Sequence, residues 1–376
     1  MGESSCQMMD PERNCNIVMK GGITSGIVFP LALVKIARAF RFRNLGGTSA
    51  GAIAAAAAAA AELGRVKGGF ASFERLAELP DDLGNSVGNR SRLFTLFQPQ
   101  ESTAPVFDTL AAALGGGRTV LFRVISAGLL MFPVGSALGA SVGAVLLLAV
   151  LGRAADQLRW LGIGLSVFVI AAGTVAGATA AFVRRFIVSI PSNMYGLCSG
   201  LSVGVRPGLP PPLTDWFTDY LDQLAGRPIG DSTPPLTFEE LHQVPAGSPV
   251  RHRLINLEVM TTCITHGRPY RLPFREDDDL HENHFFFDRD EFSRLFPARV
   301  VKYLIENARP IDEADKTRYG SLVPLPVPEK LPVIVAVRMK ARARRRVSAS
   351  ASVRARGRLA AVRGLGVSTR RCRGHT

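Results

Sequence analysis

Short strand-like runs and longer helix-like runs of apolar residues follow one another in the first part of the chain. Residues 16–19 form a short apolar run that ends in a glycine-rich segment, and the apolar stretch 27–40 has helix-like content. A second short strand is expected over 42–45, ended by a glycine pair, and an alanine-dominated helix over 50–64. This order of elements predicts an α/β domain with a parallel sheet.

Two long uncharged segments dominate the middle of the chain. Residues 124–152 contain 29 residues without a charge, and residues 160–183 contain 24 more. At ~1.5 Å per helical residue, either is long enough to cross a hydrocarbon layer of ~30 Å. The seven-residue connection 153–159 predicts an antiparallel helical hairpin in a membrane. A buried helix pair in a large soluble core is the alternative.

The arginines that flank this hairpin predict its orientation. Four lie outside it and two lie in its loop, where Asp156 partly offsets them. The positive-inside rule therefore places both termini of the hairpin in the cytoplasm. The outer arginines are Arg118, Arg123, Arg184 and Arg185, and the inner ones are Arg153 and Arg159.

The part of the chain after the hairpin again has α/β character. A proline-rich connector at 207–212 precedes a candidate amphipathic helix at 213–225. A strand is expected at 254–262, a helix at 292–307, and a buried strand at 331–337, where valine and isoleucine dominate.

The net charge of +14 resides entirely in the C-terminal segment. Residues 330–376 contain 14 Lys and Arg and no acid, whereas the rest of the chain is neutral. The body therefore gives no reason to expect a nucleic-acid partner. The arginine-rich end is interpreted either as a basic tail for anionic lipid or nucleic acid, or as a gene segment translated out of frame, which is the preferred interpretation. Five scattered cysteines favour reduced thiols over a disulfide framework.

A G-x-S-x-G sequence occurs where the second strand meets the alanine-rich helix. In a nucleophile elbow, small neighbours allow a tight strand-to-helix turn, so that the serine hydroxyl stands clear of the sheet at a helix N-terminus. The alternative is an ordinary helix-capping serine. The five residues are Gly47, Thr48, Ser49, Ala50 and Gly51.

A second glycine-rich loop precedes Ser49 by 27 residues, at Gly22. It also follows a strand and opens a helix, so its backbone amides could stabilise an oxyanion. A phosphate-binding loop is the alternative, but the loop has neither the G-x-G-x-x-G nor the P-loop spacing.

Together these two motifs resemble those of the patatin-like phospholipase family. The resemblance is specific over residues 14–64 and looser over 190–338. It implies a three-layer α/β/α fold, here interrupted by a transmembrane helical hairpin, and hydrolysis of lipid acyl esters by a Ser–Asp dyad without a cofactor or metal. The resemblance makes Ser49 the nucleophile.

The same resemblance assigns the oxyanion hole to Gly21, Gly22 and Ile23, within the D-G-G-G-x-R-G motif of the family. Gly26 matches the last glycine of that motif. Three positions depart from it, because Lys20 replaces the aspartate, Ile23 the third glycine, and Ser25 the arginine. Backbone amides at Gly22 and Ile23 could still serve, since amide direction matters more than side-chain identity.

The catalytic aspartate of the family is missing. It belongs to a D-G-[GA] motif late in the domain, and this sequence contains no Asp-Gly dipeptide. A shift of reading frame near Met339 would explain both this loss and the unusual tail. The nearest late carboxylates, Asp288 and Asp290, are expected to cap a helix. His281, His284 and Asp277–Asp279 are expected to form a solvated loop rather than a metal site, and nothing in the sequence places His266 near Ser49.

The sequence therefore predicts a membrane-associated lipid acyl hydrolase whose catalytic part faces the cytoplasm and whose activity is impaired. Its partners would be the membrane lipid substrate and the bilayer, with oligomeric state left open. A non-enzymatic, membrane-anchored lipid-binding protein or pseudoenzyme, and a lipid acyltransferase, are the alternatives. The expected divisions are 14–117 and 187–338 for the two parts of the patatin-like domain, 118–186 for the hairpin, and 339–376 for a disordered or out-of-frame tail.

Overall fold

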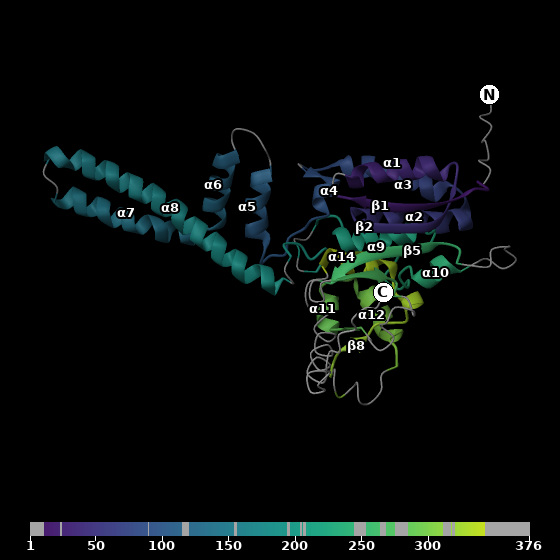
Figure 1. The fold of residues 1–376 in the computed structure, drawn as a ribbon. Coiled ribbons are helices and arrows are strands. Elements are labelled where there is room, and N and C mark those ends of the chain that lie inside the picture. The colour runs from purple at the N-terminus through teal and green to yellow at the C-terminus, as the bar shows by residue number, and fades with distance from the viewer. Residues whose placement is uncertain are drawn as a thin grey trace, which may run out of the picture. The chain divides into compact units, whose positions relative to one another are not determined.

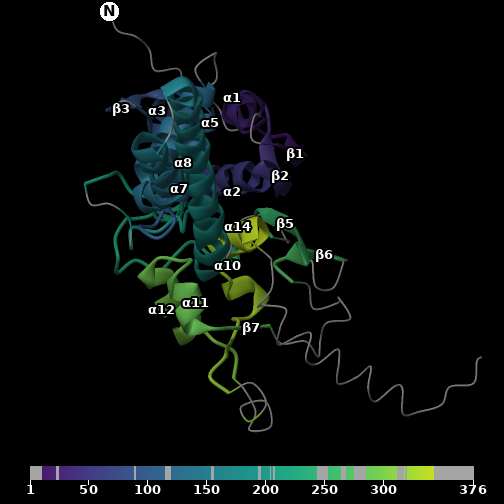
Figure 2. The same cartoon turned by 90° about the vertical axis from the view of Figure 1, so that its left-hand side faces the viewer.

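The chain is mixed α/β and divides into two compact units. The computed structural model describes residues 11–342 except 23–24, 89, 115–119, 154–155, 194–195, 204, 206–207, 244–252, 264–267, 275–284, 311–316 and 318–319. An α/β unit contains Met1–Phe94 and Leu213–Thr376, and a helical unit contains Thr95–Pro212. Figures 1 and 2 show the elements from two directions.

The main sheet of the α/β unit has the strand order β1-β2-β5-β6. Strands β1, β2 and β5 are parallel, and β6 is antiparallel to β5. These strands are β1 Asn14–Gly21, β2 Arg41–Ser49, β5 Asn256–Cys263 and β6 Arg268–Leu272. The prediction of a sheet with parallel strands is confirmed.

Helices join and cover these strands. α1 connects β1 to β2, and α2 leaves the end of β2 directly. Two-stranded pairs β3–β4 and β7–β8 complete the unit. The remaining elements are α1 Ser25–Ala37, α2 Ala50–Gly68, α3 Ala71–Gly84, β3 Ser86–Val87, β4 Arg90–Ser91, α4 Arg92–Thr95 (which crosses the unit boundary), α9 Leu213–Leu224, α10 Phe238–His242, β7 Phe286–Phe287, α11 Arg289–Ser293, α12 Ala298–Glu306, β8 Val323–Pro324, a 3₁₀ turn Pro328–Lys330 and α14 Val333–Arg342.

Helix α2 lies at the centre of the α/β unit. Its run of alanines from Ala55 to Ala61 is at most 3% exposed, and the helix contacts the sheet as well as α3, α9 and α14. Small side chains permit this close packing from several sides. A Cβ added at Gly64 would lie 2.0 Å from the Leu224 carbonyl oxygen of α9. The alanine-rich segment is therefore a core helix rather than a surface helix.

The other face of the sheet carries a polar row among the described residues. Asn44 Nδ2 donates to Asn16 Oδ1 at 2.7 Å, and Asn256 Nδ2 donates to Asn44 Oδ1 at 3.1 Å. The three asparagines lie directly opposite one another in β1, β2 and β5. Parallel sheets are usually covered on both faces, so this row is unusual and helps to fix the register of the strands.

Two sequence predictions about the C-terminal part were wrong. The buried strand expected at 331–337 is a helix, because α14 begins at Val333, directly after Pro332. An apolar run that is buried on all sides has no periodicity to distinguish strand from helix, and proline favours a helix start. The single helix expected at 292–307 is divided into α11 and α12, with Pro297 immediately before α12. Proline lacks the N–H that a continuous helix would need there.

His242 gives the α/β unit a predicted dependence on pH. Burial, and secondarily the positive charge of Arg253, lower the pKa of His242 from 6.5 to about 4. The unfolded chain therefore binds a proton that the folded chain rejects, and stability is lost as pH falls from about 6.5 towards 4. The full shift corresponds to about 3 kcal/mol, and partial exposure of the ring reduces this to about 1–2 kcal/mol.

Denaturant unfolding of the wild type and a His242→Gln variant at pH 7 and pH 4.5 measures this effect. Between pH 7 and pH 4.5, the wild type should lose about 1–2 kcal/mol more unfolding free energy than the variant does, because only the wild type has the buried imidazole. A difference that does not depend on pH would contradict the prediction.

The helical unit contains the two long apolar helices. Its elements are α5 Ala104–Leu114, α6 Val120–Met131, α7 Pro133–Arg153 and α8 Asp156–Ser192. The segments Pro133–Gly152 and Trp160–Ser192 are long and apolar enough to cross a membrane, and only 11% of the most apolar stretch of each is buried. Figure 1 shows α7 and α8 as a long antiparallel pair.

Glycines hold α7 and α8 together, while large apolar side chains face outward. A Cβ added at Gly139 would lie 1.8 Å from the Gly173 carbonyl oxygen, so the two backbones touch there. Leu138, Val142 and Leu148 are 67–70% exposed. Small residues between helices with large apolar residues outside are typical of helices packed in lipid, where solvent does not drive the apolar side chains inward. The arrangement favours the membrane interpretation over a soluble core.

Replacing Gly139 with leucine is expected to separate the two helices by about 2 Å, because the side chain would collide with the α8 backbone. Spin labels at the exposed positions 138 and 175 would measure the separation in lipid nanodiscs. Gly164→Leu is the matched control, since nothing lies within 4 Å of a Cβ added there. Equal label distances in the two variants would contradict the close glycine contact.

Candidate active site

Ser49 occupies a sharp turn between β2 and α2, as the nucleophile-elbow interpretation requires. Its backbone angles are φ 57° and ψ −133°, and it has the only positive φ outside glycine among the described residues. A non-glycine residue in this region is strained by about 1–3 kcal/mol. The serine is exposed, and its side chain makes no capping hydrogen bond to α2. Ser49 therefore holds the N-cap position of α2 without capping the helix through its side chain.

The two flanking glycines of the motif are sterically required. A Cβ added at Gly47 would lie 2.2 Å from the Gly51 carbonyl oxygen, and one added at Gly51 would lie 2.2 Å from the Met19 carbonyl oxygen. Side chains larger than hydrogen would push α2 away from the ends of β1 and β2. The spacing of the motif thus follows from the tightness of the turn.

The glycine-rich loop lies beside Ser49. Gly21 is paired with Ser49, and Lys20 with Thr48, across the parallel strands β1 and β2. Gly22 is exposed, with open space where a side chain would be. A Cβ added at Gly26 would be 3.9 Å from the Ala50 Cβ, so the start of α1 approaches the start of α2. Ile23, the third predicted oxyanion residue, lies outside the described residues.

Two helix N-termini meet at this edge of the sheet. α2 begins at Ala50, directly after β2, and α1 begins at Ser25, four positions after the last residue of β1. The unpaired amides and dipoles of the first turns favour negative charge. The amide of Ala50, the residue after the serine, holds the position that donates to an oxyanion in nucleophile elbows.

Exposed apolar side chains lie on the first turns of the two helices that begin at the edge where Ser49 lies. On the first turns of α1, Ile27 and Val28 are 62% and 64% exposed, and Leu31 is 56% exposed. On α2, one turn after Ser49, Ile53 is 41% exposed. This apolar rim was not predicted from the sequence, although the nearly uniform apolarity of residues 26–34 is a usable signal for it.

The structure gives Ser49 no general base among its described residues. No hydrogen bond between Ser49 and a carboxylate or imidazole is seen in that part of the chain. Asp288 caps α11, because its Oδ1 accepts from the Glu291 amide at 2.9 Å, as the sequence predicted. Other candidates lie outside the described residues: His266, His281, His284 and Asp277–Asp279. Within the described part of the chain, no group of His, Cys, Asp and Glu side chains is suited to hold a metal ion.

Comparison with curated proteins identifies a relative named RpoH suppressor, from Rhizobium meliloti (strain 1021). The two sequences are 36% identical over 331 residues, which cover 82% of this chain and 48% of the relative. The chain thus spans about half the length of the curated relative it matches. No family model matches the chain, and no solved structure matches it.

Proposed function

We propose that this chain is a patatin-type serine acyl hydrolase whose nucleophile is Ser49. The observation that carries the proposal is the strained backbone of Ser49 at a turn that only glycines can flank. Strain of this kind persists where the surrounding structure enforces it, and it is concentrated at functional sites. An ordinary strand-to-helix connection would not need it.

In the proposed reaction, Ser49 Oγ forms a bond to the ester carbonyl carbon and loses its proton to a general base. The amides of Gly22 and Ala50 would donate to the resulting oxyanion, which collapses as the ester C–O bond breaks and the alcohol leaves with a proton. Water then adds to the acyl-serine and releases the fatty acid. The patatin-like three-layer fold belongs to this proposal, whereas the motif that supplies the dyad aspartate in the family is missing here. Since the sequence has no Asp-Gly dipeptide, we expect the chain to react slowly.

A lipid is the substrate class that best fits the surroundings of Ser49. Ile27, Val28, Leu31 and Ile53 expose apolar surface at the edge of the sheet where an acyl chain would approach. Exposed apolar side chains that are grouped on a protein surface often mark a binding site. The helices α7 and α8 would anchor the chain in the bilayer that contains such substrates, with both hairpin ends in the cytoplasm.

A fluorophosphonate probe, which reacts with activated serines, tests the proposal on the purified full chain. We expect slow labelling of the wild type and of Ser86→Ala, a control at an exposed serine, and none of Ser49→Ala. Loss of a general base lowers rates by ~10²–10⁴-fold, so a normal labelling rate would overturn the argument from the missing aspartate. Equal labelling of Ser49→Ala and the wild type would exclude Ser49 as the nucleophile.

Products formed from phosphatidylcholine, with and without added alcohol, separate the remaining alternatives. A hydrolase releases free fatty acid in both cases, whereas an acyltransferase forms a new ester when the alcohol is present. A pseudoenzyme gives neither product, and it leaves Ser49 unlabelled by the probe.

A further inference from the structure

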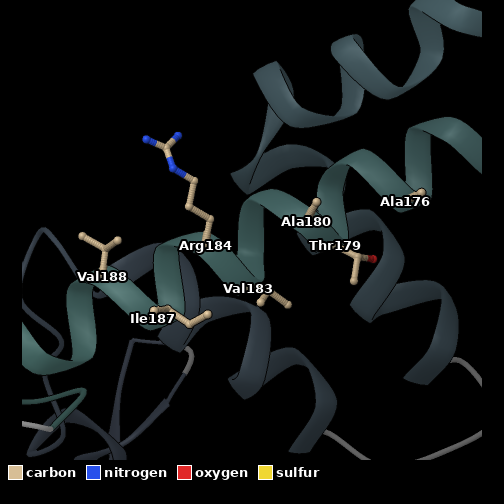
Figure 3. A pocket seen from close by; sticks show the side chains of 7 residues that line it. All are labelled: Ala176, Thr179, Ala180, Val183, Arg184, Ile187 and Val188. Atoms are coloured by element: carbon tan, nitrogen blue, oxygen red, sulfur yellow. The ribbon is translucent and has the colours of Figure 1, made fainter.

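Helix α8 carries a shallow, open apolar groove on an exposed face, and all of its lining residues belong to this one helix. The groove has a volume of about 700 Å³, and it is lined by Ala176, Thr179, Ala180 and Val183 before Arg184 and by Ile187 and Val188 after it. Arg184 lies at the same groove, and its side chain extends clear of the helix (Figure 3). The site thus combines an exposed, mainly apolar strip with a cation partway along it.

Arg184 lies near the level at which α7 begins, eight residues before the end of the apolar span Trp160–Ser192. A Cβ added at Gly135, near the start of α7, would lie 2.6 Å from the Ala181 Cβ, so Ala181 is level with the first turn of α7. Arg184 is three residues beyond Ala181, or ~4.5 Å along the helix axis. From Ala176 to Arg184 the rise is ~12 Å, close to the ~15 Å of one leaflet of the hydrocarbon core.

The two adjacent arginines at this level have different roles. Arg185 Nε donates to the Ser102 carbonyl oxygen at 3.0 Å, which ties α8 to the segment before α5. Arg184 is exposed and has no carboxylate partner within the described part of the chain. A guanidinium pairs well with the planar oxygens of a phosphate, and it is more weakly hydrated than an ammonium. Arg184 is therefore available to a ligand, whereas Arg185 holds the fold.

We propose that this groove binds one anionic phospholipid, with an acyl chain along Ala176–Val183 and the phosphate at Arg184. The inference rests on the proposed insertion of α7 and α8 in a bilayer, and it does not depend on the chemistry of Ser49. The occupant differs from a substrate lipid, because its site lies on the helical unit alone and contains no nucleophile.

Photocrosslinking in lipid nanodiscs tests the site on the full chain. The discs contain phosphatidylcholine and phosphatidylglycerol at 3:1, with a trace of either lipid carrying a diazirine in its acyl chain, and mass spectrometry locates the labelled residues. An arginine near a membrane surface attracts an anionic lipid about fivefold. We therefore expect about fivefold more label on 176–183 from phosphatidylglycerol than from phosphatidylcholine.

Three variants separate this site from ordinary contact with the bilayer. Arg184→Gln should abolish the preference for phosphatidylglycerol, and Ala180→Phe should reduce labelling by both lipids because its ring fills the groove. Ala171→Phe, on a different exposed face of α8, should leave the pattern unchanged. Equal labelling by the two lipids, or a preference that survives in Arg184→Gln, would overturn the proposal. Absence of any label on α7 and α8 would overturn membrane insertion and this inference together, while leaving the Ser49 proposal standing.

Discussion

Replacing Ser49 with glycine is expected to stabilise the α/β unit while removing its reactivity. Glycine adopts positive φ at little cost, so the change relieves ~1–3 kcal/mol of strain and loses ~0.5–1 kcal/mol through greater freedom of the unfolded chain. The net gain of about 1 kcal/mol should raise the unfolding temperature by about 2–4 °C. The same variant should not react with the fluorophosphonate probe, because it lacks the hydroxyl.

Fluorescence of Trp216 in α9 can report the unfolding of this unit, in a Trp160→Phe background that removes the signal from the hairpin. Ser49→Ala is the matched control, since it removes the hydroxyl but keeps a Cβ, and with it the strain. Its unfolding temperature should stay close to that of the parent protein. Equal stabilisation by glycine and alanine would show that the backbone at Ser49 is not strained.

The local structure around Ser49 was predictable because its causes are local. A tight turn needs glycines at fixed spacing, a core helix among several neighbours needs alanines, and both requirements can be seen in the sequence. The expected break at Gly46 and Gly47 was too early, since β2 continues to Ser49. These glycines stay in the strand, where Gly47 lies against α2.

The C-terminal elements were less predictable because their conformation depends on distant contacts. Val333, Val335 and Ala336 are fully buried, and the Val333 amide donates to the Leu236 carbonyl oxygen at 2.9 Å. Branched apolar residues favour strands in general, but packing against α2, α9 and β5 decides the outcome here. Helix α14 also extends past Met339 to Arg342, a continuity that the change in composition there did not suggest.

The general base is the part of the candidate site that the sequence could not supply. A base is recognised by its distance from the nucleophile, and residues far apart in the chain can provide it. The family motif identifies the base from sequence only where its Asp-Gly dipeptide is present. The same limit applies to the apolar rim, because its members come from two helices that only the fold brings to one edge of the sheet.

The support beneath the proposed site depends on a buried carboxylate. Asp222 lies in α9 and is fully buried. Its Oδ1 is 3.0 Å from Arg227 Nε, and its Oδ2 is 2.7 Å from Arg299 Nη1. Burial raises the pKa of Asp222, although both arginines act to lower it. Because Arg299 belongs to α12, this group joins α9 to α12. Helix α9 in turn packs against α2 at Gly64, so the helix that begins after Ser49 rests on this network.

Asp222→Ala is therefore expected to destabilise the α/β unit by at most about 3–5 kcal/mol, because Arg227 and Arg299 lose their shared buried partner. They keep only the more exposed carboxylates of Glu240 and Asp219. Asp219→Ala is the matched control, since Asp219 Oδ1 lies 2.8 Å from Arg299 Nη2 but its side chain is 44% exposed. An exposed ion pair contributes at most about 1 kcal/mol. Denaturant unfolding followed by Trp216 fluorescence measures both variants. Similar losses in the two would show that burial does not set the strength of this network, and a loss confined to Asp222→Ala would show that it does.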